Sequence, residues 1–146
     1  MTLPLEPAYP DAELVMMAIH RDVPPEGSYI GTWIPQDPEP NTIVVQRIGG
    51  GPDPYDVTDY PLFRVLYYGA TRNAAMDLSR RGEQYVKAHS GRSIKRPGDP
   101  ADGVLIDSAG VDINGTLDED LDPDERRVAK NYILGLRRQF HLSATP

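Results

Sequence analysis

The chain has 146 residues and a net charge of −7, and it contains no cysteine. Its length is typical of one domain, so we expect a single domain over residues 1–146. The negative charge argues against broad binding to nucleic acid or to anionic membranes, and the absence of cysteine excludes disulfides and thiolate metal sites.

The first predicted elements are a helix and a strand. Asp11 is a favourable N-cap, and the apolar residues after it share one helical face, which predicts a helix to about Ile19. Aromatic and β-branched residues predict a strand over Ser28–Ile34. The proline-rich segment Pro35–Asn41 predicts a long loop, because proline has a fixed φ angle and no backbone donor.

Two more strands and a second helix are predicted in the middle of the chain. The strands are Thr42–Ile48 and Leu62–Tyr68, and the glycines and prolines between them predict a loop over Gly49–Tyr60. Thr71 is a favourable N-cap for a helix that ends near His89.

Glycine in the middle of this second helix has a predicted role. Gly82 costs about 1 kcal/mol relative to alanine, so we expect it to permit a close packing contact. After the helix, Arg92–Asp102 predicts a loop and Gly103–Ile113 a strand, with a turn at Asn114–Gly115.

The last segment fits two patterns. Four apolar residues spaced by four suit a helix: Val128, Tyr132, Leu136 and Phe140. The alternation of apolar residues around Gly135 suits a strand. Our prediction is a helical turn at Pro123–Arg126 followed by a strand to about Phe140. The whole order predicts an α+β fold, a mostly antiparallel β-sheet with two helices packed on one face and long loops.

Charge is unevenly distributed along the chain. The first 60 residues carry a net charge of −8 and the remainder +1. Asp118–Glu125 holds six acidic residues and no basic one, whereas Arg126–Arg138 holds five basic residues and no acidic one. Such separation either directs two surfaces to different partners or reflects solvated faces.

Motifs for catalysis or cofactor binding are weak. Gly49–Gly51 follows a strand, as a phosphate loop does, but lacks the Gly-Lys-Ser/Thr signature. The acidic run partly matches a calcium loop, yet Pro123 stands where that loop needs glycine. The three histidines are far apart in sequence. We therefore expect no catalytic residue, no metal and no cofactor, and an interaction protein rather than an enzyme.

The order of features resembles a known family. A first helix precedes a proline-rich stretch and the sequence Ile43–Gly50, then an extended strand and a long helix follow, and the segment Asp122–Arg126 leads into Tyr132–Arg137. This order resembles the tail terminator proteins of long-tailed bacteriophages, especially those of actinobacterial hosts. The likeness covers almost the whole chain.

The resemblance implies a structural virion protein without catalytic residues. It implies a homo-hexameric ring on the major tail tube protein, which ends tube polymerisation and offers its other face to a head-side connector or neck protein. It implies assembly in the bacterial cytoplasm and a place at the head-proximal end of the tail. It implies no membrane partner and no specific nucleic acid, beyond DNA passing through the ring channel. Alternatives are a head–tail connector or neck protein, or a soluble binding module.

Two groups of residues are candidate interface residues. The basic group is Arg126, Arg127, Lys130, Arg137 and Arg138, and the acidic or aromatic group is Asp53, Tyr55 and Asp56. We expect the acidic N-terminal half and the basic Arg126–Arg138 strand to meet different neighbours. Reversal of Arg137 and Arg138 to glutamate is then expected to impair ring formation or docking, and normal virion assembly by this double variant would contradict that expectation.

Overall fold

The computed structural model describes residues 9–55, 57–95, 103–112 and 126–137. The helices are α1 (Ala12–Ile19) and α2 (Arg72–Ala88). The strands are β1 (Ile30–Gly31), β2 (Ile43–Pro52), β3 (Thr58–Tyr68), β4 (Arg92–Ile94), β5 (Val104–Val111) and β6 (Arg127–Arg137). They form one sheet in the order β1-β2-β3-β6-β5-β4. The β1–β2 pair is parallel and the other pairs are antiparallel.

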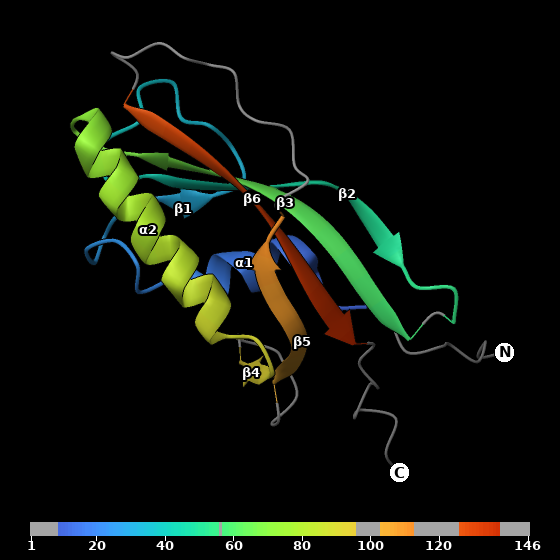
Figure 1. Cartoon of the computed structure of the whole chain (residues 1–146). Helices are drawn as coiled ribbons and strands as arrows, with labels where there is room; N and C mark the ends of the chain where they lie inside the picture. Colours follow the sequence, from blue (N-terminus) through green and yellow to red (C-terminus); the bar gives the residue numbers. More distant parts are fainter. Residues whose placement is uncertain (1–8, 56, 96–102, 113–125, 138–146) are drawn as a thin grey trace, which may run out of the picture.

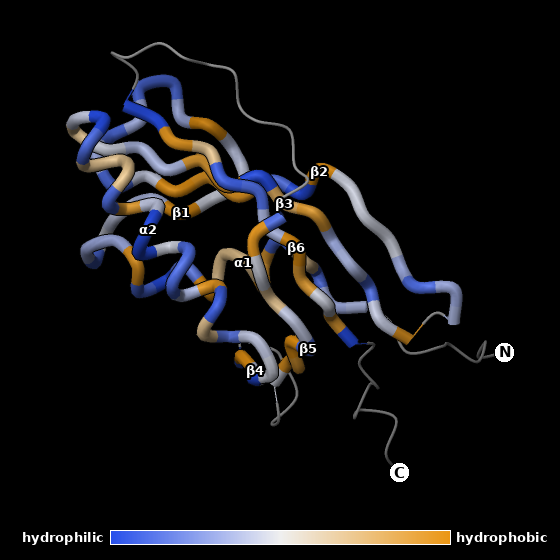
Figure 2. The backbone as a smooth tube through the Cα atoms, in the orientation of Figure 1, coloured by the Kyte–Doolittle hydropathy of each residue, from blue (hydrophilic) through white to orange (hydrophobic). Residues whose placement is uncertain are grey.

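Both helices lie on the same face of the sheet (Figure 1). α1 contacts β2 and β4, whereas α2 contacts β3, β5 and β6. Figure 2 shows α2 as mostly hydrophilic, with the hydrophobic residues concentrated in the strands beneath the helices. This arrangement confirms the expected α+β class, with a mostly antiparallel sheet covered on one face by two helices.

Both helices begin where the sequence predicts. The Asp11 carboxylate accepts hydrogen bonds from the backbone N–H groups of Glu13 and Leu14, at 3.0 and 3.2 Å. The Thr71 hydroxyl accepts one from the N–H of Ala74 at 3.1 Å. These side chains satisfy donors that have no partner inside the first helical turn, and they fix the start of each helix. Neither described helix is long and apolar enough to cross a membrane.

The last described segment is a strand, as predicted. Tyr132, Leu134 and Leu136 are fully buried, whereas Ile133 between them is 37% exposed. This alternation places every second side chain toward the helices. The predicted helical turn lies outside the described residues apart from Arg126, and so do the predicted end of the strand at residues 138–140 and the turn at Asn114–Gly115.

Three predictions need correction. Only Ile30–Gly31 of the predicted strand Ser28–Ile34 pairs with a neighbour, because the chain then turns away into bends. The predicted loop Gly49–Tyr60 is largely strand, since Gly49–Pro52 pairs with β3 after a bulge between Arg47 and Gly49. The predicted loop Arg92–Asp102 begins with β4, whose Ile94 is buried against the core.

A chain of buried polar groups joins α1 to the centre of the sheet. His20 Nδ1 lies 2.9 Å from the carbonyl oxygen of Met16, so this nitrogen carries the proton and donates it. Nε2 therefore accepts from the Tyr67 hydroxyl at 2.7 Å, and the Tyr67 oxygen accepts from the Tyr132 hydroxyl at 2.8 Å. The hydrogen bonds thus run in one direction, from β6 through β3 to α1.

The expected close contact at Gly82 is confirmed. A Cβ atom placed on Gly82 would overlap the ring and hydroxyl of Tyr67. Glycine therefore lets α2 approach β3 closely enough to seal the chain of buried polar groups. Burial raises the pKa of both Tyr67 and Tyr132, so both hydroxyls stay protonated at physiological pH.

Candidate interaction surfaces

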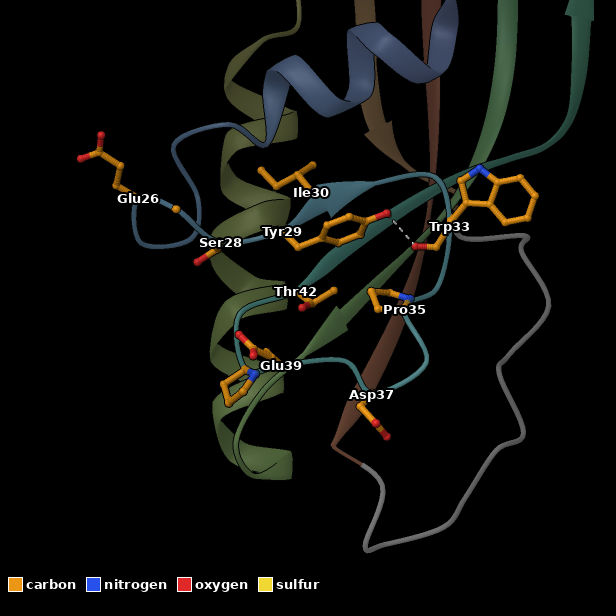
Figure 3. Close-up of a pocket in the computed structure, with 11 residues that line it drawn as sticks. Glu26, Ser28, Tyr29, Ile30, Trp33, Pro35, Asp37, Glu39 and Thr42 are labelled. Carbon is orange, nitrogen blue, oxygen red and sulfur yellow. Dashed lines mark hydrogen bonds between the residues drawn. The ribbon is translucent and has the colours of Figure 1, made fainter.

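A wide open hollow lies beside β1, at one edge of the sheet, and we call it the edge groove (Figure 3). Its volume is about 840 Å³. The lining residues come from the loops on both sides of β1: Glu26, Gly27, Ser28, Tyr29, Ile30, Trp33, Pro35, Asp37, Glu39, Pro40 and Thr42. The edge groove thus combines two aromatic side chains with three carboxylates.

Local contacts hold the aromatic residues of the edge groove in place. The Tyr29 ring lies across Gly31, where any Cβ atom would overlap it. The Tyr29 hydroxyl donates to the carbonyl oxygen of Trp33 at 3.1 Å, as Figure 3 shows. The Trp33 side chain itself remains 81% exposed and Tyr29 remains 43% exposed. Large exposed aromatic side chains on a fixed loop are typical of protein contact sites.

The edge groove is acidic. Figure 3 shows Glu26, Asp37 and Glu39 around the Tyr29 ring, with the carboxylates of Glu26 and Asp37 pointing away from it. No lysine or arginine is among the residues that line it. The edge groove therefore combines exposed aromatic side chains with negative charge, which suits a cationic group with an apolar stem.

The opposite edge of the sheet is basic. β4 is the last strand in the sheet order, and it carries exposed Arg92 and is followed by exposed Lys95. No acidic residue lies between Lys87 and Lys95. Within the described part of the chain, neither the Arg92 nor the Lys95 side chain has a carboxylate partner. We call Arg92, Ser93 and Lys95 the basic edge.

Charged side chains link β2 to β3 and to α1. The Arg47 guanidinium makes two 3.2 Å hydrogen bonds to the Asp59 carboxylate, which is only 5% exposed. The Arg47 Nε donates to the carbonyl of Gly49, and its backbone N–H donates to the Glu13 carboxylate of α1. These contacts take up one backbone N–H and one carbonyl group in the part of β2 that does not pair with β1.

The predicted acidic and aromatic interface residues lie at the tip of the β2–β3 hairpin. The Asp53 carboxylate accepts a 2.9 Å hydrogen bond from the backbone N–H of Val57 and so shapes the turn. Tyr55 is 85% exposed, which leaves its ring available to a neighbour. Asp56 lies outside the described residues.

The predicted basic interface residues do not form one patch. Arg126 and Arg127 lie at one end of β6 and Arg137 at the other, about 33 Å apart at the usual rise of a strand. Arg137 donates to the Asp107 carboxylate at 2.7 Å, and this contact raises the pKa of the Arg137 guanidinium. Arg138 lies outside the described residues.

Lys130, the remaining basic candidate, faces the helices. Its ammonium group lies 3.2 Å from the Glu83 carboxylate of α2, and Lys87 is 3.5 Å from the same group. Burial opposes ionisation of Glu83, but the two lysines outweigh it and lower the pKa of this carboxyl. Lys130 thus links β6 to α2. That any of these basic residues contacts a neighbour stays a prediction.

The sheet face away from the helices carries an apolar strip. Leu62 of β3 is paired with Ile133 of β6, and both side chains are partly exposed. Ile48 of β2, next to the bulge, is 48% exposed, and Tyr60 of β3 is 39% exposed. The strip and the edge groove were not predicted from the sequence. Trp33, a large aromatic residue just before the proline-rich segment, was a sequence signal for the edge groove.

The described residues hold no cluster of three or more side chains that would bind a metal ion. The described residues form four surfaces with distinctive chemistry: the edge groove, the basic edge, the hairpin tip and the apolar strip. A comparison with family models finds a match to one described as phage tail termination protein, over residues 8–143. A comparison with curated proteins finds no match.

Proposed function

The chain belongs to the phage tail termination protein family, and on that premise we propose that it forms a ring that caps the tail tube. As a member of this family it is a structural component of the phage tail. In our proposal the ring ends polymerisation of the tube protein at the head-proximal end of the tail. The opposite face of the ring then receives the head-side connector or neck protein.

The observation that carries the proposal is the family match, which spans residues 8–143 of 146. The chemistry of the surface supports it. A tube grows because each layer repeats the face that it covers, and a terminator must bind that face without repeating it. The described part of this chain offers several unlike surfaces, including the acidic edge groove, the basic edge and the apolar strip. Unlike surfaces permit different neighbours on each side.

The hairpin tip supports contact with a component along the tail axis. It carries Tyr55, which is 85% exposed, and Val57, which is 49% exposed. The Arg47–Asp59 pair and the contact with Glu13 brace the base of the hairpin against α1. A braced hairpin with an aromatic tip suits insertion into a pocket of a partner, because little ordering entropy remains to be lost.

Deletion of the gene in the phage is expected to give abnormally long tail tubes without attached heads. Without the cap, the growing end of each tube keeps the surface that adds the next layer. Electron microscopy of lysates from the deletion phage measures tube length directly. Supply of the wild-type protein from a plasmid is the matched control and is expected to restore tails of uniform length.

A head–tail connector or neck protein is the second candidate. Loss of such a protein leaves tails of normal length that lack heads, because tube growth has already ended. Uniform tails in the deletion phage would therefore contradict the terminator proposal and favour this alternative.

A further inference from the structure

We propose that copies of this protein join head to tail, with the basic edge of one subunit seated in the edge groove of the next. This inference rests on the proposed function, because it names the surfaces through which the ring closes. The occupant of the edge groove is thus Arg92 and Lys95 of a second copy.

The two surfaces lie on the two outermost strands. β1 and β4 are separated by five strand spacings, about 24 Å along the sheet at the usual separation of strands. The α1 helix packs in between, against β2 and β4. The edge groove of one subunit therefore cannot take up the basic edge of the same subunit, and their contact has to be intermolecular.

The two surfaces are complementary in charge and shape of side chain. The edge groove supplies the carboxylates of Glu26, Asp37 and Glu39 and the exposed indole of Trp33. The basic edge supplies the guanidinium of Arg92 and the ammonium of Lys95, both exposed. An arginine side chain pairs with carboxylates and stacks on an aromatic ring, and both contacts strengthen when water is excluded.

Both edge strands are too short to carry the contact through their backbones. β1 has two residues and β4 has three, so a partner strand finds few free hydrogen-bonding groups there. The side chains must then specify the neighbour. Opposite charges favour contact between the basic edge and the edge groove. Like charges disfavour contact between two edge grooves or between two basic edges.

A contact between unlike surfaces has a consequence for assembly. A row of joined subunits keeps one free edge groove at one end and one free basic edge at the other, so the contact repeats until the row closes into a ring. A contact between like surfaces would stop at a dimer. The same head-to-tail contact explains how several copies of one small subunit can form a ring around an axis.

Charge exchange tests the proposal directly. The groove variant carries Glu26→Lys, Asp37→Lys and Glu39→Lys, and the edge variant carries Arg92→Glu and Lys95→Glu. Each variant alone is expected to assemble at least tenfold more weakly than the wild type, as measured by sedimentation velocity. An equimolar mixture of the two, and the variant with all five changes, is expected to recover assembly, because opposite charges then face each other again.

The control exchanges charges away from both surfaces. Asp77 and Arg80 form an exposed ion pair on α2, and the variant Asp77→Arg/Arg80→Asp is expected to assemble like the wild type. Unchanged assembly of the groove and edge variants would overturn the proposal. Loss of assembly that neither the mixture nor the five-fold variant recovers, with normal thermal unfolding, would overturn it too.

Cross-linking covers the case in which subunits join only on a tail. The chain has no cysteine, so Ser28→Cys in the edge groove and Ser93→Cys on the basic edge introduce the only thiols. With a flexible bis-maleimide, the double variant is expected to give a ladder of linked subunits, in solution or in purified tails. Each single variant is expected to give monomers only.

The outcomes separate this inference from the proposed function. Tails of normal length that contain the double variant but give no ladder would overturn the edge pairing and leave the terminator role intact. Linked dimers from a single-cysteine variant would also overturn it, because they indicate a contact between like surfaces. Overlong tails that still yield the ladder would show that the edges pair but that the ring does not end the tube.

Discussion

Replacing Gly82 by alanine is expected to destabilise the protein by about 3 kcal/mol, although alanine is the better helix former by about 1 kcal/mol. The added Cβ would lie only 2.6 Å from Cζ of Tyr67, well inside van der Waals contact. Tyr67 cannot move aside, because it is fully buried and its hydroxyl is bonded to both His20 and Tyr132. The midpoint of urea unfolding measures this loss of stability, provided that the free energy of unfolding depends on urea concentration equally in both proteins.

Two further variants make the measurement specific. Gly51→Ala is the matched control, since a Cβ at Gly51 meets nothing within 4 Å, and its stability is expected to stay within about 0.5 kcal/mol of wild type. In a Tyr67→Leu background, Gly82→Ala is expected to cost much less, because the ring that it strikes is gone. Equal costs of Gly82→Ala in both backgrounds would contradict the close contact as the cause.

The free energy of unfolding is expected to fall by about 3 kcal/mol between pH 7 and pH 4 through His20 alone. Burial lowers the pKa of His20 to about 4, although the hydrogen bond to Met16 opposes this shift. The ordinary pKa of histidine is 6.5, so the unfolded chain binds the proton more tightly than the folded protein. Stability is therefore complete above pH 6.5 and is lost as the pH falls toward 4.

A variant without the imidazole isolates this effect. His20→Gln is expected to be less stable than wild type at pH 7, and to lose less stability than wild type between pH 6.5 and 4.5. The carboxyl of Glu83 has a lowered pKa, so its contribution is lost below this interval and does not interfere. Urea unfolding at several pH values measures how the free energy of unfolding of each protein changes with pH. The same change for both proteins would contradict the role of His20.

The helix caps, the glycine contact and the last strand could all be predicted from local sequence. Asp11 and Thr71 cap their helices because short polar side chains reach the first free N–H groups in any context. In the last segment, apolar residues spaced by four suited a helix, whereas apolar residues at every second position suited a strand. The sheet decided between them, because β6 pairs with β3 on one side and with β5 on the other.

The glycine-rich part of β2 could not be predicted, because its strand character depends on a distant segment. Gly49, Gly50 and Gly51 have no preference for extended structure, and they pair because β3 lies beside them. Ile94 likewise forms part of a strand only because β5 offers it a partner. Pairing between segments far apart in sequence leaves little trace in either one.

The candidate surfaces were the least predictable feature. The three carboxylates of the edge groove lie at positions 26, 37 and 39, in loops whose meeting depends on the turn after β1. The predicted basic strand was correct as a strand, but its charges are divided between an internal pair at Lys130 and a pair with Asp107 at Arg137. Charge counted along the chain therefore located the basic residues without showing which of them face outward.

The position of β6 has a consequence for how the protein is made. β6 follows every other described strand in the sequence, yet it lies between β3 and β5, so the centre of the sheet cannot form until β6 has been synthesised. A prematurely ended polypeptide lacks the Tyr132 hydroxyl and the leucines that fill the core, and it exposes β3 and β5 to proteases and chaperones. A polypeptide that stops before β6 therefore cannot present the native surfaces of the folded protein.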